Sequence, residues 1–202
     1  MSKLFIESVP TEDKKIAFTY DDGPDPNYTE SILELLEKYN AKATFFMIGE
    51  QIEKYKDIAK EVAYRGHEIG NHTFHHHDLT SLGKEAIESE LAKTDQCIRE
   101  IVKQTPVSFR PPFMAWNETA DQVARQFSYS IIGARNFSAK DWENPGIEWI
   151  VNETKRQIQP GSIFIFHDGY GDRTQTVEAT KRLLEEYAGE YQFVTVRHLL
   201  GK

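Results

Sequence analysis

The chain has 202 residues, a length that suits one large domain with a sizeable core. Hydrophobic residues make up 39% and charged residues 28%, which excludes a largely disordered or collagen-like chain. The 32 acidic residues outnumber the 24 basic ones, so the surface attracts neither nucleic acid nor an anionic membrane. Cys97 is the only cysteine, which excludes an intramolecular disulfide.

Neither a targeting segment nor a domain boundary stands out. No apolar run approaches the ~18 residues that a transmembrane helix needs. Residues 1–10 hold only a short apolar patch, interrupted by Glu7, which does not fit a secretory signal. We therefore expect a cytoplasmic protein or a chain whose leader has been removed. Because no linker, repeat or low-complexity segment divides the sequence, we expect residues 1–202 to form a single domain.

Segments typical of strands alternate with segments typical of helices. Apolar runs predict strands over residues 15–20, 43–48, 67–71, 106–109, 130–134, 162–166 and 192–196. Apolar side chains at helical spacing predict helices over residues 28–39, 51–65, 84–103, 118–127, 147–158 and 176–187. This alternation is typical of a parallel sheet covered by helices. The periodicity fits a barrel and a doubly wound sheet equally well.

In both architectures, functional residues gather where strands end. Asp21 and Asp22 follow the first strand, where one carboxylate can bind a metal while the other faces a substrate. An Asp-Gly-Pro surface turn is the alternative. His72 and His76 follow the third strand, and their spacing puts both imidazoles on one face of a helical turn, as a metal site requires. His72 with His75 is also workable, and a solvated histidine cluster is the alternative.

Further polar residues follow the later strands. Arg110 precedes two prolines on a rigid, extended turn, where it could orient a carboxylate or simply face solvent. Asp141 and Trp142 follow the fifth strand, and His167 ends the sixth, although Trp142 and His167 could equally belong to the core. Because the ends of parallel strands meet at one rim, we expect these residues to lie together. Such a rim has the parts for metal-assisted hydrolysis.

From residue 16 to about residue 200, the sequence resembles polysaccharide deacetylases, the NodB-homology domain of carbohydrate esterase family 4. Ordered motifs carry the resemblance: Thr-Tyr-Asp-Asp-Gly-Pro at 19–24, His-Thr-Phe-His-His at 72–76, Arg-Pro-Pro-Phe at 110–113, Asp-Trp at 141–142 and Ile-Phe-His at 165–167. Ser138 departs from the family pattern, which has an aspartate there, and Phe113 stands where tyrosine is frequent. The implied fold is α/β, a distorted (β/α)7-type barrel.

The resemblance implies a metal and a general base. A divalent metal, most often Zn²⁺ with Co²⁺ or Ni²⁺ as alternatives, would be held by Asp22, His72 and His76. This match selects His76 over His75 as the second histidine ligand. Asp21 would be the general base, and Arg110 would hold its carboxylate ionised and in place.

The same resemblance implies roles for the remaining motif residues. His167 would protonate the leaving amine, with Asp141 as the partner that keeps it protonated. The backbone N–H of Phe113 would stabilise the oxyanion together with the metal. Trp142 and Ile165 would wall a small pocket for the acetyl methyl group.

The implied activity is removal of N-acetyl groups from N-acetylglucosamine-containing glycans, of the chitooligosaccharide or peptidoglycan type, with release of acetate. The partner is then an acetylated glycan, and the sequence leaves the oligomeric state open. Two alternatives remain: a related metal-dependent hydrolase of other C–N amide or imide bonds, and an inactive carbohydrate-binding relative. Only Ser138 favours the inactive relative.

Overall fold

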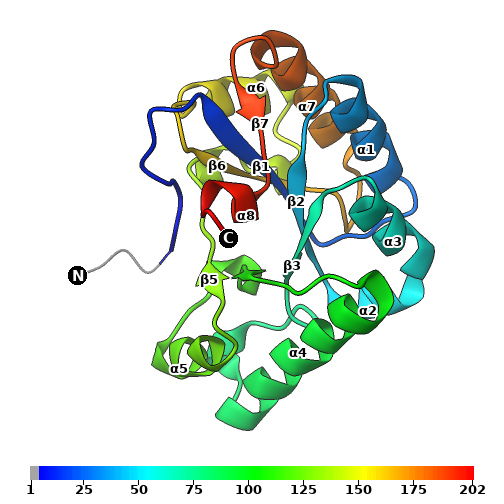
Figure 1. Cartoon of the computed structure of the whole chain (residues 1–202), viewed down its shortest axis with the longest axis vertical. Helices are drawn as coiled ribbons and strands as arrows, with labels where there is room; N and C mark the ends of the chain where they lie inside the picture. Colours follow the sequence, from blue (N-terminus) through cyan, green and yellow to red (C-terminus); the bar gives the residue numbers. More distant parts are fainter. Residues whose placement is uncertain (1–4) are drawn as a thin grey trace.

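The computed structural model describes residues 5–202, which fold around one curled parallel sheet (Figure 1). The strand order is β5-β4-β3-β2-β1-β6, and β7 also pairs with β1. All of these strand pairs are parallel. The strands are β1 (Lys15–Asp21), β2 (Ala43–Met47), β3 (Glu68–Asn71), β4 (Ser108–Phe109), β5 (Ser130–Ile131), β6 (Ile163–His167) and β7 (Gln192–Phe193).

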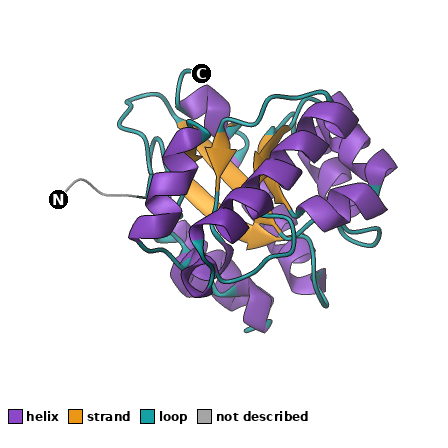
Figure 2. Ribbon diagram, turned by 90° about the horizontal axis from the view of Figure 1, so that it is seen from below, coloured by secondary structure: helices purple, strands orange, loops and turns teal. Residues whose placement is uncertain are grey.

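Helices surround the strands, as Figure 2 shows from a second direction. They are α1 (Thr29–Lys38), α2 (Gly49–Lys54), α3 (Lys56–Tyr64), α4 (Lys84–Cys97), α5 (Glu118–Gln126), α6 (Ile147–Lys155), α7 (Thr174–Tyr187) and α8 (Val196–Leu199). Within residues 5–202, none of these helices is long and apolar enough to cross a membrane. The predicted α/β class and distorted (β/α)7-type barrel are confirmed.

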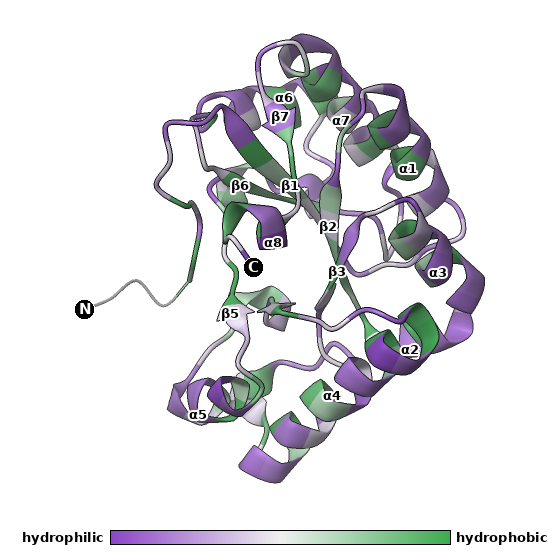
Figure 3. Ribbon diagram, in the orientation of Figure 1, coloured by the Kyte–Doolittle hydropathy of each residue, from purple (hydrophilic) through white to green (hydrophobic). Residues whose placement is uncertain are grey.

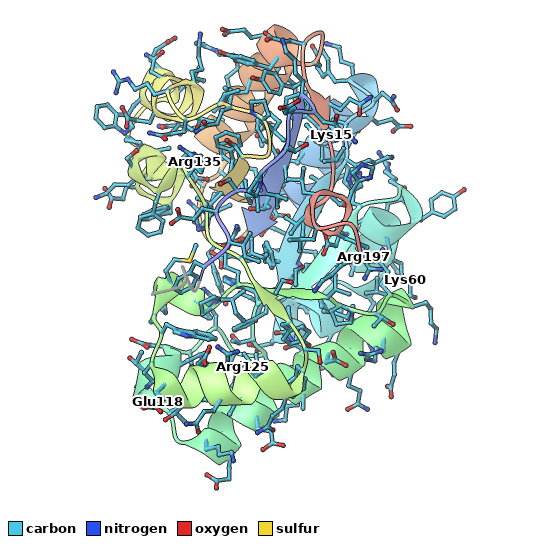
Figure 4. The ribbon with its side chains drawn as sticks, turned by 60° about the vertical axis from the view of Figure 1, so that its left-hand side comes forward. Lys15, Lys60, Glu118, Arg125, Arg135 and Arg197 are labelled. Carbon is cyan, nitrogen blue, oxygen red and sulfur yellow. The ribbon has the colours of Figure 1, made fainter. Side chains whose placement is uncertain are left out.

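The core lies between the sheet and the helices, where the hydrophobic faces of both elements meet (Figure 3). Phe18 of β1 packs edge to face against Phe164 and Phe166 of β6 and Phe193 of β7, at centroid distances of 5.7, 5.0 and 4.8 Å. Such aromatic packing adds to the free energy gained by removing apolar area from water. Many charged side chains lie on the outer surface, as Lys60 does in Figure 4, while a smaller set is buried.

The segment before β1 joins the two ends of the sheet. Ile6 donates a 2.9 Å hydrogen bond to the carbonyl of Ile131 and accepts one of 2.9 Å from Gly133, next to β5. Val9 donates a 2.9 Å bond to the carbonyl of Gly161, just before β6. The distorted barrel is therefore closed by residues 6–9, a role that the sequence analysis did not predict.

Several predicted boundaries are wrong. The predicted helix 51–65 is two helices, because the backbone at Tyr55 (φ −120°, ψ 51°) leaves the helical region. The predicted helix 84–103 ends its α-helical part at Cys97 and continues as a π-helical turn to Val102. The predicted strand 192–196 ends at Phe193, and Val196 begins α8 instead.

Gly161 provides a test of the closing segment. Its φ is +79°, and a Cβ there would overlap the carbonyl oxygen of Val9. Gly171 is a matched control, because its φ is +83° and a Cβ there meets no atom of the described residues within 4 Å. We expect Gly171→Ala to lower the free energy of unfolding by about 1–2 kcal/mol through backbone strain alone. We expect Gly161→Ala to lower it by a further 1–3 kcal/mol, roughly, through overpacking. Urea unfolding measures both, and equal losses would show that residues 6–9 do not brace the barrel.

Candidate active site

A cavity of about 280 Å³ opens at the carboxyl ends of the strands. Asp21 ends β1 and lies opposite His167, the last residue of the neighbouring strand β6. Of the sequence-predicted site residues, all but Arg110 and Asp141 line this cavity, and those two lie buried behind it. The lining residues are Asp21, Asp22, His72, His76, Pro111, Phe113, Met114, Phe137, Trp142, Ile165 and His167.

The Arg110 side chain is fully buried, yet its guanidinium is well provided with acceptors. Nη1 donates to Asp21 Oδ1 at 2.7 Å and to Thr19 Oγ1 at 2.6 Å. Nε and Nη2 donate to the carbonyls of Ile132 (3.2 Å) and Gly133 (2.9 Å), which follow β5. A buried cation is tolerated only with such partners, so the guanidinium has one orientation. It thereby fixes the carboxylate of Asp21.

Asp22, His72 and His76 direct one donor atom each toward a common point. Nε2 of His72 lies 3.4 Å from Asp22 Oδ1, and Nε2 of His76 lies 3.2 Å from the same oxygen. Nδ1 of His72 lies 2.6 Å from the carbonyl of Arg110, which can only accept, so Nδ1 carries the ring proton. Nε2 of a neutral His72 ring then presents a lone pair toward Asp22.

The place where Asp22, His72 and His76 converge favours a bound cation. Asp22 Oδ1 is buried and accepts no hydrogen bond from any residue between 5 and 202. Burial and the proximity of His72 lower the pKa of His76 to about 4, so its ring is neutral at neutral pH. The ligand atoms of Asp22, His72 and His76 lie within 4.8 Å of one another, and a cation between them would balance the carboxylate charge and the lone pair of His76. Two imidazoles and one carboxylate fit a divalent transition metal.

The carboxylate of Asp22 is held in its charged form. Burial acts to raise its pKa, but at the acidic pH where this carboxyl titrates the protonated imidazoles of His72, His167 and His76 outweigh burial and lower the pKa to about 2. Asp22 is therefore ionised at neutral pH, as a metal ligand must be.

Left-handed backbone conformations, rather than a helix, place these three side chains. Residues 72–76 do not form the helical turn that would place both imidazoles on one face, since Thr73 and His76 have φ values of +65° and +59°. Asn71 Oδ1 accepts from the backbone N–H of Thr73 at 2.9 Å, and Thr73 Oγ1 accepts from that of His76 at 3.1 Å. Asp22 also has a positive φ, of +76°. Such conformations are costly in residues other than glycine and gather at functional sites.

His167 and Asp141 form a second pair, in which Asp141 is buried and His167 is partly buried. Nδ1 of His167 donates to Asp141 Oδ1 at 2.8 Å, and the backbone N–H of His167 donates to Oδ2 at 2.8 Å. Burial lowers the pKa of His167, but the carboxylates of Asp141, Asp22 and Asp21 outweigh burial and raise the pKa to about 9. The rings of His167 and Trp142 pack edge to face, with centroids 5.3 Å apart. His167 is thus an imidazolium at neutral pH.

Ser138, where the family pattern has an aspartate, does not line the cavity. Its hydroxyl is exposed and donates to Glu153 of α6 at 2.8 Å. The carboxylate of Asp141 finds its remaining partner in Thr176 of α7, whose hydroxyl donates to Oδ2 at 2.8 Å. The sequence analysis missed Thr176, which no motif marks. It also missed Phe137, which could have been found as an aromatic residue in the loop of the fourth motif.

Comparisons with known proteins agree with this geometry. A family model described as polysaccharide deacetylase matches residues 8–132. A peptidoglycan-N-acetylglucosamine deacetylase of Bacillus cereus is 40% identical over 194 residues, which cover 95% of this chain and 91% of that protein. A chitooligosaccharide deacetylase of Rhizobium leguminosarum bv. trifolii is 34% identical over 173 residues, covering 83% of this chain and 80% of that protein.

A solved structure of similar shape supports the same relationship. It is the crystal structure of a peptidoglycan N-acetylglucosamine deacetylase in complex with 4-naphthalen-1-yl-N-oxidanyl-benzamide. It matches with a TM-score of 0.89 and 30% identity, over 95% of this chain and 90% of that one. The family model and the relatives cover most of the chain, and the chain therefore belongs to the polysaccharide deacetylase family.

Proposed function

We propose that this protein is a metal-dependent N-deacetylase of N-acetylglucosamine-containing glycans, of the peptidoglycan or chitooligosaccharide type. The observation that carries the proposal is the convergence of Nε2 of His72 and Nε2 of His76 on Asp22 Oδ1, a buried oxygen that accepts no hydrogen bond from the described residues. The activities named for the relatives from Bacillus cereus and Rhizobium leguminosarum support the class of substrate.

The three converging residues would hold the metal, for which we propose Zn²⁺, with Co²⁺ or Ni²⁺ as alternatives. When bound, a divalent metal polarises the acetamide carbonyl and lowers the pKa of a water molecule beside it. Only an unprotonated imidazole nitrogen can be a ligand, and the lowered pKa of His76 keeps its ring in that form at neutral pH. Hydrolysis then adds the oxygen of water to the carbonyl carbon, breaks the C–N bond and yields acetate and an amine.

The proton of the attacking water goes to Asp21. Arg110 holds Oδ1 of this carboxylate at 2.7 Å, so Oδ2 is the oxygen that accepts the proton. Oδ2 lies 3.9 Å from Nε2 of His72, and the base is therefore next to the metal ligands. As the carbonyl oxygen gains negative charge, the backbone N–H of Phe113 at the cavity wall donates a hydrogen bond to it.

The leaving nitrogen takes a proton from His167. Its Nδ1 is bound to Asp141 at 2.8 Å, so Nε2 is the atom that faces the substrate. A raised pKa keeps this proton available at neutral pH. Trp142 and Ile165 form an apolar part of the wall of the same cavity, which suits the methyl group of an acetyl substituent.

The alternatives are a hydrolase of other C–N amide or imide bonds and an inactive carbohydrate-binding relative. The inactive relative loses its single argument, because Ser138 lies outside the cavity and Asp141 keeps its partners without it. The hydrolase of other bonds shares the same site, so only substrates separate it from the proposal.

Acetate release tests the proposed function. Zinc-loaded protein should release acetate from chitooligosaccharides or from peptidoglycan glycan strands, while small cyclic imides stay intact. Dialysis against a chelator should reduce release to background, and added Zn²⁺ should restore it. Turnover of the imides without acetate release would instead support the other class of C–N hydrolase. Absence of any turnover at full zinc occupancy would support the inactive relative.

Asp141→Asn tests the role of His167 as the acid. The protonated ring is the active form, so its raised pKa should place the alkaline limb of kcat/KM well above neutral pH. Removing the charge of Asp141 lowers the pKa of His167 and should move that limb to lower pH by roughly 1–3 pH units. Glu143→Gln is the matched control, because Glu143 lies in the same turn and pairs with Lys140 at 3.0 Å. An alkaline limb at the same pH in Asp141→Asn and the wild type would exclude His167 as the titrating acid.

A further inference from the structure

A second cluster of metal-binding side chains lies outside the cavity. His75 and His77 flank the proposed ligand His76 in sequence, but neither lines the cavity. Both instead approach Glu90 of α4. The ligand atoms of His75, His77 and Glu90 lie within 4.8 Å of one another.

The two imidazoles present the same atom to the same oxygen. Nδ1 of His75 lies 2.6 Å from Glu90 Oε1, and Nδ1 of His77 lies 3.8 Å from it. Their rings are stacked, with centroids 5.3 Å apart and an interplanar angle of 23°. Donor atoms about 3.3 Å apart are what tetrahedral bonds of roughly 2.0–2.1 Å require. The two observed distances bracket that separation, and the exposed His77 ring has to turn out of the stack for both Nδ1 lone pairs to point at one ion.

The carboxylate of Glu90 is held in one position. Its side chain is only 8% exposed, and Oε2 accepts hydrogen bonds from the backbone N–H groups of Phe74 (3.0 Å) and His75 (2.8 Å). Oε1 therefore stays directed at the two imidazoles. The histidine side chains are 39% and 56% exposed, so water can complete the coordination of an ion.

We propose that His75, His77 and Glu90 form a second divalent-metal site, separate from the one in the cavity. Two imidazoles and a carboxylate select Zn²⁺, Ni²⁺ or Cu²⁺ over Mg²⁺ and Ca²⁺, which prefer oxygen ligands only. The ion replaces the proton between His75 and Glu90, which passes to solvent. Because two of the ligands are exposed, this site is weaker than the buried one.

A bound ion would join the loop that carries His76 to α4. Glu90 already holds the backbone of this loop through Phe74 and His75, so the ion adds a link at His77. The inference does not depend on the deacetylase proposal, since it concerns metal binding alone.

His77→Ala is the sharpest test, because the His77 ring makes no hydrogen bond with the described residues and its loss leaves the His75–Glu90 contact in place. Apo protein is titrated with ZnCl₂ by calorimetry, and bound zinc is counted by mass spectrometry at saturation. Wild type should bind a tight ion and a weaker one. In His77→Ala the tight step should be unchanged, and the weaker step should be at least about tenfold weaker, since even an outer-shell change costs that much.

Two further variants identify the site. His198→Ala, on α8, is a matched histidine control that should keep both steps. Asp22→Asn should lose the tight step and keep the weaker one. The proposal is overturned if wild type binds a single ion, if His77→Ala keeps the weaker step at full strength, or if His198→Ala loses it as well.

Discussion

The buried guanidinium of Arg110 is the interaction on which the barrel and the site both depend. Its donors connect β1, through Thr19 and Asp21, to the segment after β5, through the carbonyls of Ile132 and Gly133. The guanidinium also lies over the ring of Phe46, 4.4 Å from its centroid. A charge in this position is stable only while every one of these partners is in place, so the fold cannot relax there without exposing or unpairing it. The carbonyl of the same residue fixes the ring of His72. One residue thus orients a carboxylate through its side chain and a proposed metal ligand through its backbone.

Separate partners allow several buried carboxylates to lie at one small cavity or directly behind it. Asp21 is paired with Arg110, Asp22 with the two imidazoles of the proposed metal site, and Asp141 with His167. Without this division, adjacent carboxylates would repel and one of them would take up a proton. The left-handed backbone at Asp22, with a φ of +76°, contributes to this separation. It turns the chain so that the carboxylates of Asp21 and Asp22 reach different partners. The backbone strain is therefore part of what gives two neighbouring aspartates different surroundings.

Much of the fold and site could be predicted because local patterns determine them. Continuous apolar strands alternate with amphipathic helices, and polar residues stand where strands end, so the motifs of this sequence locate the rim. What could not be predicted depends on contacts between distant segments. Residues 6–9 become part of the barrel only because β5 and β6 leave a gap there. The loop after β3 has apparent helical spacing, but side-chain oxygens of Asn71 and Thr73 hold it in left-handed conformations instead. Helical periodicity likewise continues across Tyr55, where the backbone breaks.

The central claim is that the neighbours Asp21 and Asp22 do different work, one as the base and the other as a metal ligand. Asp21→Asn tests it most directly, because the amide has nearly the same shape as the carboxylate but cannot accept the proton of the attacking water. Zinc content and kcat are measured together on this variant, with Asp22→Asn beside it. Asp21→Asn should keep its zinc while kcat falls by about 10²–10⁴, and Asp22→Asn should lose zinc. A zinc-loaded Asp21→Asn with the kcat of the wild type, or loss of zinc from that variant instead of from Asp22→Asn, would contradict the assignment.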